Sequence, residues 1–165
     1  MTNLLYIPLL LLGLSQCQRE SLTAPEEQPA GAPTVMDGIK FGQEFTLQQF
    51  EQVTLYGGDT PRKLHLSAQQ LTDSRCPANV TCVHYGSAAL VLSASNSQGK
   101  NDHILLCIGD CGVGGMRTMH TVTAAVGETA YRFSLVEVKP FSGQEKKDEA
   151  KLARLLVEKI GNASS

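Results

Sequence analysis

The sequence predicts a mainly β protein, an antiparallel β-sandwich or barrel of about six to seven strands with one C-terminal amphipathic helix. Two observations predict this class. Short segments with apolar side chains at alternate positions follow one another at fairly even spacing, separated by turns rich in Gly, Pro and Asn. No segment with helical periodicity lies between them, and such a pattern begins only after residue 141.

The predicted strands differ in how many of their faces are apolar. In the second segment Leu64, Leu66 and Ala68 face one way and polar side chains face the other, which is typical of a half-buried strand. In the third segment Ala88 to Leu92 is apolar on both faces, which favours a central strand. The segments are residues 41–56 (one long strand or two short ones), 63–71, 83–95, 103–108, 118–126 and 129–138.

The C-terminal tail predicts an amphipathic helix. Ser142 and Glu145 have the spacing of a capping box at a helix start. An apolar side chain then recurs at every fourth position, which would place one apolar stripe on a helix. The residues of this stripe are Leu152, Leu156 and Ile160. We expect the helix to pack over one end of the sheets.

The first 16 residues are predicted to be a signal peptide. Residues 4–14 are almost entirely apolar, which is too short for a membrane-spanning helix but fits the core of an export signal. The run ends in Leu-Ser-Gln-Cys at Cys17, which resembles the lipobox of bacterial lipoproteins. The resemblance implies that Cys17 is the lipidated first residue of the mature protein. The alternative is a plain secretory signal with an incidental cysteine.

The lipidated cysteine would be followed by a flexible tether, so that both together occupy residues 17–37. This segment carries three prolines and several acidic side chains but few residues that could bury in a core. We place the β domain at residues 38–141 and the helix packed on it at residues 142–161. This organisation predicts a protein of the cell envelope, lipid-anchored to a bacterial membrane on its periplasmic or surface face.

Composition limits the classes of partner. The chain has 165 residues and a formal net charge of −2, and it has no basic run of the kind that binds phosphate backbones, so we expect no nucleic acid partner. Hydrophobic residues make up 42%, which is enough for one core. Aromatic residues make up only 5% and Trp is absent, so Val, Leu, Ile and Ala should build that core.

Four cysteines remain when Cys17 is set aside, and export favours their oxidation to disulfides. Three pairings are open. We favour the two local pairs, and a crossed pairing that ties two strands together is the alternative. A Cys₄ zinc site is a further alternative, although the spacings are wider than the usual C-x₂-C. The local pairs are Cys76 with Cys82 and Cys107 with Cys111.

A second metal hypothesis concerns copper, which accepts thioether and imidazole ligands. The candidate ligands are Met116, Met119, His120 and His84. The alternative is that the methionines pack at a loop or strand edge and that the histidines face solvent. We favour this alternative, and we therefore expect no resident metal or other cofactor.

Catalytic signatures are missing from the sequence. It contains no G-x-S-x-G elbow, no H-E-x-x-H and no Walker loop. Ser74 and Ser87 are available as hydroxyls, but no pattern marks either as an activated nucleophile. We therefore expect no catalytic activity.

One motif in the middle of the chain resembles a known pattern. Ser74 to Ala88 matches S-R-C-P-x-x-V-x-C-x-x-x-G-x-A at every fixed position. This resembles a motif of small uncharacterised bacterial envelope proteins, many of them lipoproteins. The resemblance implies a compact β domain on a lipid anchor and implies no activity. That family commonly has an aromatic residue where this chain has His84, which is followed here by Tyr85.

The residues of the motif also have structural explanations. Asp73 can accept from backbone N–H groups two residues on, as in an Asx-turn. Arg75 can pair with Asp73 or donate to loop carbonyls, and Val80 can tuck back as a small core of the loop. The functional alternative is that Arg75 and the rigid loop contact a partner.

Together these observations predict a membrane-anchored envelope lipoprotein that serves as a small binding or interaction module. Its expected partners are the membrane, through the lipid anchor, and an unidentified envelope protein. Two other functions stay open. The first is a copper- or other metal-handling envelope protein, and the second is a secreted module that inhibits a protease through the loop around Cys76 and Cys82.

Overall fold

The structure is a computed structural model that describes residues 35–112 and 114–162. Across these residues the chain is mainly β, with ten strands and no helix, and so with no helix long and apolar enough to cross a membrane. The mainly β prediction is confirmed. The predicted signal peptide, Cys17 and the tether up to residue 34 lie outside the described residues.

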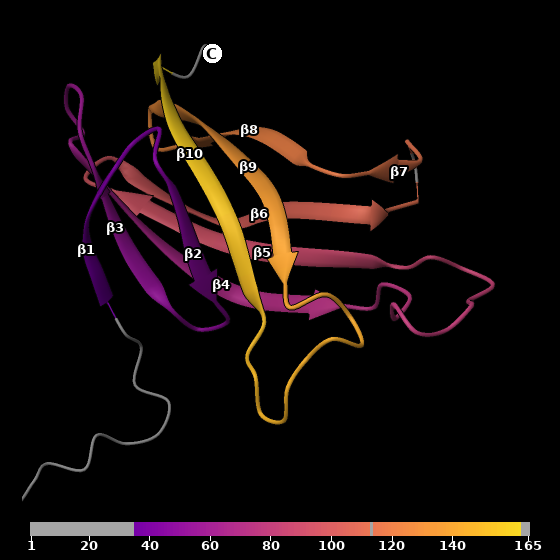
Figure 1. The fold of residues 1–165 in the computed structure, drawn as a ribbon. Helices are drawn as coiled ribbons and strands as arrows, with labels where there is room; N and C mark the ends of the chain where they lie inside the picture. The colour runs from indigo at the N-terminus through magenta and orange to yellow at the C-terminus, as the bar shows by residue number, and fades with distance from the viewer. Residues whose placement is uncertain (1–34, 113, 163–165) are drawn as a thin grey trace, which may run out of the picture. The chain divides into compact units, whose positions relative to one another are not determined.

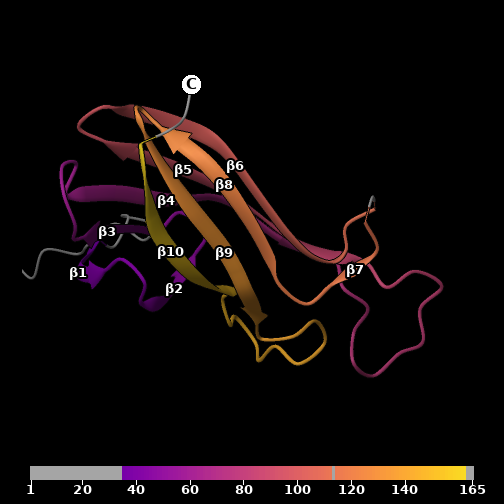
Figure 2. The same ribbon diagram turned by 90° about the horizontal axis from the view of Figure 1, so that it is seen from above.

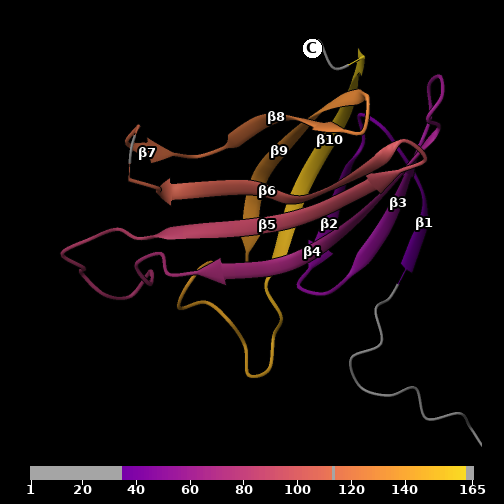
Figure 3. The same cartoon turned by 180° about the vertical axis from the view of Figure 1, so that it is seen from behind.

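Two sheets make up the described chain (Figures 1 and 3). The six-stranded sheet has the order β1 (Val35–Lys40), β3 (Gln52–Tyr56), β4 (Lys63–Asp73), β5 (Ser87–Asn96), β6 (Gly99–Asp110) and β7 (Met116–Arg117). The four-stranded sheet has the order β2 (Glu44–Gln48), β10 (Leu152–Asn162), β9 (Thr129–Lys139) and β8 (His120–Val126). Every pair is antiparallel except β1 with β3, which is parallel.

One hydrophobic core lies between the two sheets, because alternate side chains of each long strand turn inward. Leu64, Leu66 and Ala68 of β4 are buried, as their alternation predicts. Figure 2 shows the long strands β4, β5 and β6 curving past β8 and β9. The opposite sheet contributes the largest buried rings, Tyr131 and Phe133, and otherwise the core is mostly Leu, Val, Ile and Ala.

Each predicted strand segment contains a strand, but residues 83–86 lie in the connection before β5, and the strand count of six to seven is too low. Residues 41–56 form two strands, β2 and β3, joined by a tight turn in which Phe50 adopts a φ of 67°. β1 and β7 were not predicted. β1 has no clean alternation, since its register with β3 shifts at Gly38, and β7 is only two residues long. β1 also takes three residues from the predicted tether, which therefore ends before residue 35.

The predicted C-terminal helix is wrong. Its second half is strand β10, which lies between β2 and β9 in the four-stranded sheet. Its first half is a loop with turns, in which the Glu145 carboxylate accepts a hydrogen bond from the Gly143 N–H (2.7 Å) instead of capping a helix.

The error has a physical reason, because residues 152–160 satisfy two periods at once. The side chains that the helix would bury, Leu152 and Ile160, are 38% and 48% exposed. The side chains between them, at every second position, are fully buried, and these are Ala153, Leu155 and Val157. The backbone hydrogen bonds that decide between the two periods come from β2 and β9, which are distant in sequence.

Candidate functional site

The connection between β4 and β5 contains a disulfide-closed loop, which we name the stapled loop and define as residues 76–85. Figures 1 and 3 show this connection extending beyond the ends of the two strands that it joins. The Cys76–Cys82 disulfide closes it, with the two Cα atoms 5.9 Å apart. The second disulfide joins Cys107 at the end of β6 to Cys111.

The local cysteine pairing is therefore confirmed, and the crossed pairing and the Cys₄ zinc site are wrong. All four sulfur atoms lie in disulfide bonds, so none is a thiolate that could bind zinc. The described residues also hold no group of three or more His, Cys, Asp or Glu side chains placed for a metal ion.

The base of the stapled loop is fixed by a buried ion pair between Arg75 and Asp73. Arg75 Nε donates to Asp73 Oδ1 at 2.8 Å, and Arg75 Nη2 donates to Asp73 Oδ2 at 2.7 Å. The two side chains are only 6% and 1% exposed. The Arg75 N–H also donates to Asp73 Oδ1 (3.2 Å), as the predicted Asx-turn requires. Arg75 therefore has a structural role at the base of the loop, and little of its side chain is exposed to a partner.

The same ion pair connects the loop to the four-stranded sheet. Arg75 Nη2 donates to the carbonyl oxygen of Val138 on β9 at 2.8 Å. The guanidinium lies over the ring of Phe141, 4.3 Å from its centre, which adds a cation–π interaction. Arg75 thus holds the end of β4 in the six-stranded sheet against the end of β9 and the connection that follows it.

Lys151 is a second cation in this network. Its Nζ donates to Asp73 Oδ2 and to the Pro140 carbonyl, both at 2.8 Å, and it also pairs with Glu145. Burial alone would raise the pKa of Asp73, but hydrogen bonds from Arg75 and Lys151 outweigh it, so that pKa is lowered. Burial would lower the pKa of Lys151, but its bonds to Asp73 and Glu145 raise it.

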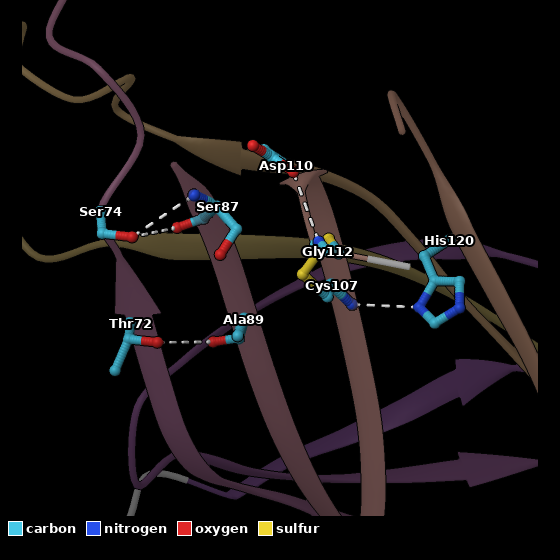
Figure 4. Close-up of a disulfide and its surroundings, with 9 residues drawn as sticks. Thr72, Ser74, Ser87, Ala89, Cys107, Asp110, Gly112 and His120 are labelled. Atoms are coloured by element: carbon cyan, nitrogen blue, oxygen red, sulfur yellow. Dashed lines mark hydrogen bonds between the residues drawn. A yellow bond between two sulfur atoms is a disulfide. The ribbon is translucent and has the colours of Figure 1, made fainter. Parts of the chain in front are cut away.

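The small residues of the motif are explained by close backbone contacts. Gly86 has a φ of 72°, and a Cβ there would collide with the carbonyl oxygen of Ser74. Ser74 Oγ donates to the Ser87 carbonyl at 3.0 Å (Figure 4). Ala88 begins the buried face of β5 and is fully buried. The motif therefore encodes the junction between the loop and the central strand.

The outer part of the stapled loop exposes apolar side chains. Val83 is 94% exposed, Val80 is 57% exposed and Tyr85 is 42% exposed. The expectation that Val80 forms a small core of the loop is therefore wrong. Exposed apolar side chains gathered on one rigid segment are typical of a contact surface. The loop contains no Asp, Glu, Lys or Arg.

Cys76 holds the most exposed part of the loop from both sides. Its sulfur is bonded to that of Cys82, which precedes Val83. Its backbone N–H donates to the carbonyl oxygen of Tyr85 at 2.6 Å, and Tyr85 follows His84. Val83 and His84 therefore form a two-residue projection, and the residues on both sides of it are attached to Cys76.

A cavity of mixed polarity lies between the loop and β7. Tyr85, Met116 and Phe141 line a cavity of about 330 Å³ that also touches Arg75, and Met116 is 58% exposed. Charged side chains of Arg117, Glu137 and Arg154 also line this cavity.

The four candidate copper ligands are divided between two places. Met116 lies on β7 and Met119 precedes β8, both more than half exposed, whereas His84 lies on the stapled loop. His120 at the start of β8 accepts a hydrogen bond at Nδ1 from the Cys107 N–H, 3.1 Å away (Figure 4). Burial, followed by the nearby Arg117 charge, lowers the pKa of His120. Only its Nε2 atom is available to a metal in this arrangement.

Comparison with protein-family models, with curated proteins and with solved structures finds no match to the chain. The candidate site therefore rests on its own geometry. Sequence reasoning missed Lys151, which lies 78 positions from Asp73 and has no local signal that would pair the two.

Proposed function

We propose that this protein is a lipid-anchored cell-envelope protein whose β domain is a binding module, with the stapled loop as its contact surface. The observation that carries this proposal is the exposure of Val83, Val80 and Tyr85 on a segment whose base is buried and ion-paired. Apolar side chains grouped on one exposed surface are a typical mark of an interaction site.

The rigidity of the loop supports binding rather than simple exposure. The disulfide and the Arg75–Asp73 pair fix the loop before any partner arrives. A pre-ordered loop loses little conformational entropy on binding, so a small apolar contact retains more of its free energy. The lack of fixed charge on the loop favours an apolar, uncharged surface on the partner.

The anchor completes the proposal. The lipobox-like sequence at Cys17 supports attachment to a membrane, and the Pro-rich segment that follows supports a spacer between membrane and domain. A membrane-anchored module of this kind would meet partners in the envelope.

Crosslinking tests the contact surface. Photoreactive benzoylphenylalanine replaces Val83 in one variant of the full chain and Leu105 in another. Each variant is irradiated in the envelope of cells that produce it. Leu105 is a suitable control because it is 57% exposed but lies on the outer face of β6. A discrete adduct from position 83 and none from position 105 supports the proposal. Identical adduct patterns, or none from either position, overturn it.

A second measurement tests the anchor separately. In bacterial cells that are fed labelled palmitate, the wild-type chain should take up label and fractionate with membranes. A Cys17→Ala variant should lose both properties. A labelled, membrane-bound Cys17→Ala chain would show that the lipobox reading is wrong while leaving the contact surface unaffected.

A further inference from the structure

The peptide bond between Val83 and His84 is held in an unusual way. Cys82, which precedes Val83, is bonded to Cys76 through sulfur. The carbonyl oxygen of Tyr85, which follows His84, accepts a hydrogen bond from the Cys76 N–H. Cys76 in turn follows Arg75, which is 6% exposed and ion-paired. The most exposed apolar side chain of the described chain thus sits on a short, doubly attached projection.

We propose that the stapled loop is a substrate-like inhibitor of a serine protease whose specificity pocket takes a small aliphatic side chain, with Val83 in that pocket. This rests on the proposed function in that both use the same surface. The inhibitor proposal adds that the partner is a serine protease and that Val83 determines which protease is bound. Val83 fits because it is aliphatic, uncharged and 94% exposed.

The chemistry of such a contact is reversible acyl transfer. The hydroxyl oxygen of the protease serine adds to the carbonyl carbon of Val83, and the bond from that carbon to the nitrogen of His84 breaks. The protease histidine takes the proton from the serine and gives it to the departing His84 amine. In the reverse direction the same amine attacks the acyl-enzyme, re-forms the peptide bond and returns the serine hydroxyl.

The loop geometry favours the reverse direction. After cleavage the acyl side stays bonded to Cys76 through the Cys82 sulfur, and the amine side stays attached through the Tyr85 hydrogen bond and the β5 ladder. The amine therefore stays at high effective concentration beside the ester, and re-formation of the bond competes with hydrolysis. An ordinary substrate loses its amine fragment by diffusion, whereas here both cleaved ends remain joined to the paired strands β4 and β5. The disulfide and the Tyr85 hydrogen bond hold these ends close to each other.

Charge narrows the class of protease. Trypsin-like pockets contain a carboxylate and require Lys or Arg, whereas elastase-like pockets are small and apolar. The loop offers neither Lys nor Arg. An elastase-type pocket is therefore the best match, and one substitution at Val83 should change the selected protease.

Inhibition assays with the full chain, purified in detergent, test this inference. The probes are elastase and trypsin. The wild-type chain should inhibit elastase and leave trypsin active. Val83→Lys should reverse this order, with a gain of about 100-fold in affinity for trypsin. Val80→Lys, which places the same charge on the same loop, should give no such gain.

The disulfide supplies the second arm. A Cys76→Ser/Cys82→Ser variant should be cleaved by elastase as a substrate, because its acyl side is then joined to position 76 only through the backbone of residues 77–81 and is no longer held beside the amine. If Val83→Lys fails to inhibit trypsin, or is cleaved as fast as the open variant, the inhibitor proposal is wrong. Crosslinking from position 83 to an envelope protein would still support the binding module in that case, so the two failures are distinguishable.

Discussion

Arg75 and Asp73 form a two-point ion pair that is almost completely buried, with donor–acceptor distances of 2.8 and 2.7 Å. Both residues lie where β4 ends, and the pair reaches β9 through the Val138 carbonyl. Since the pair also lies next to the Cys76–Cys82 disulfide, it links the packing of the two sheets to the position of the stapled loop.

Removing one member of this pair should destabilise the fold strongly. In Arg75→Ala the Asp73 carboxylate stays buried with only Lys151 as a charged partner. We expect a loss of about 3–5 kcal/mol in the free energy of unfolding, measured by urea titration. Arg154→Ala is the matched control, because Arg154 pairs with Glu44 and Glu137 but is 43% exposed. The control should lose at most about 1 kcal/mol, and equal losses would contradict a structural role for the buried pair.

The same pair predicts how stability depends on pH. The pKa of Asp73 is lower in the folded chain than in the unfolded chain, because the hydrogen bonds from Arg75 and Lys151 outweigh its burial. Its contribution is therefore complete above the unfolded pKa and is lost as the pH falls through the folded pKa. Melting temperature measured from neutral to acidic pH should fall less steeply for Asp73→Asn than for wild type. Parallel curves would show that Asp73 is not the titrating group.

Much of the β architecture follows from local alternation, and the failures occur where distant neighbours decide. Leu64, Leu66 and Ala68 point inward because β4 has one buried face. The C-terminal tail has a helical stripe and a strand alternation at once, and only pairing with β2 and β9 selects the strand.

In the candidate site, too, the short-range features can be predicted from the sequence and the long-range contacts cannot. The disulfide pairs and the Asx-turn at Asp73 are short-range, so spacing and residue type predict them. The contact of Lys151 with Asp73 depends on where the β9–β10 connection lies relative to the end of β4. No local pattern carries that information.

The strand assignment of the tail makes a prediction that is opposite to the helical one. Leu155 is fully buried, whereas Leu152 is 38% exposed. Leu155→Ala should cost about 2–5 kcal/mol in chemical unfolding, because it removes buried methyl groups and leaves a cavity. Leu152→Ala should cost less than about 1 kcal/mol. A helix packed through Leu152, Leu156 and Ile160 would give the reverse order, so these two variants decide between the assignments.

Copper binding can be tested directly. His120 offers only Nε2 to a metal ion, because Nδ1 accepts from the Cys107 N–H. His84 lies on the stapled loop, whereas Met116 lies on β7. We expect isothermal titration with Cu(I) and Cu(II) to show no binding tighter than about 1 µM. Tighter binding that is lost in both His120→Ala and Met116→Leu would contradict this expectation and would support the metal-handling alternative.

The two disulfides should contribute similarly to stability but differently to local order. Each closes a short loop, and the chain-entropy model gives about 2 kcal/mol for either one. Cys76→Ser/Cys82→Ser and Cys107→Ser/Cys111→Ser should therefore lower the free energy of unfolding by similar amounts. Under native conditions only the first variant should gain rapid proteolytic cleavage between residues 77 and 85, because only that bridge closes the stapled loop. Mass spectrometry of the fragments locates the cut. Rapid cleavage of the stapled loop in the second variant as well would show that the loop is not held independently by its own disulfide.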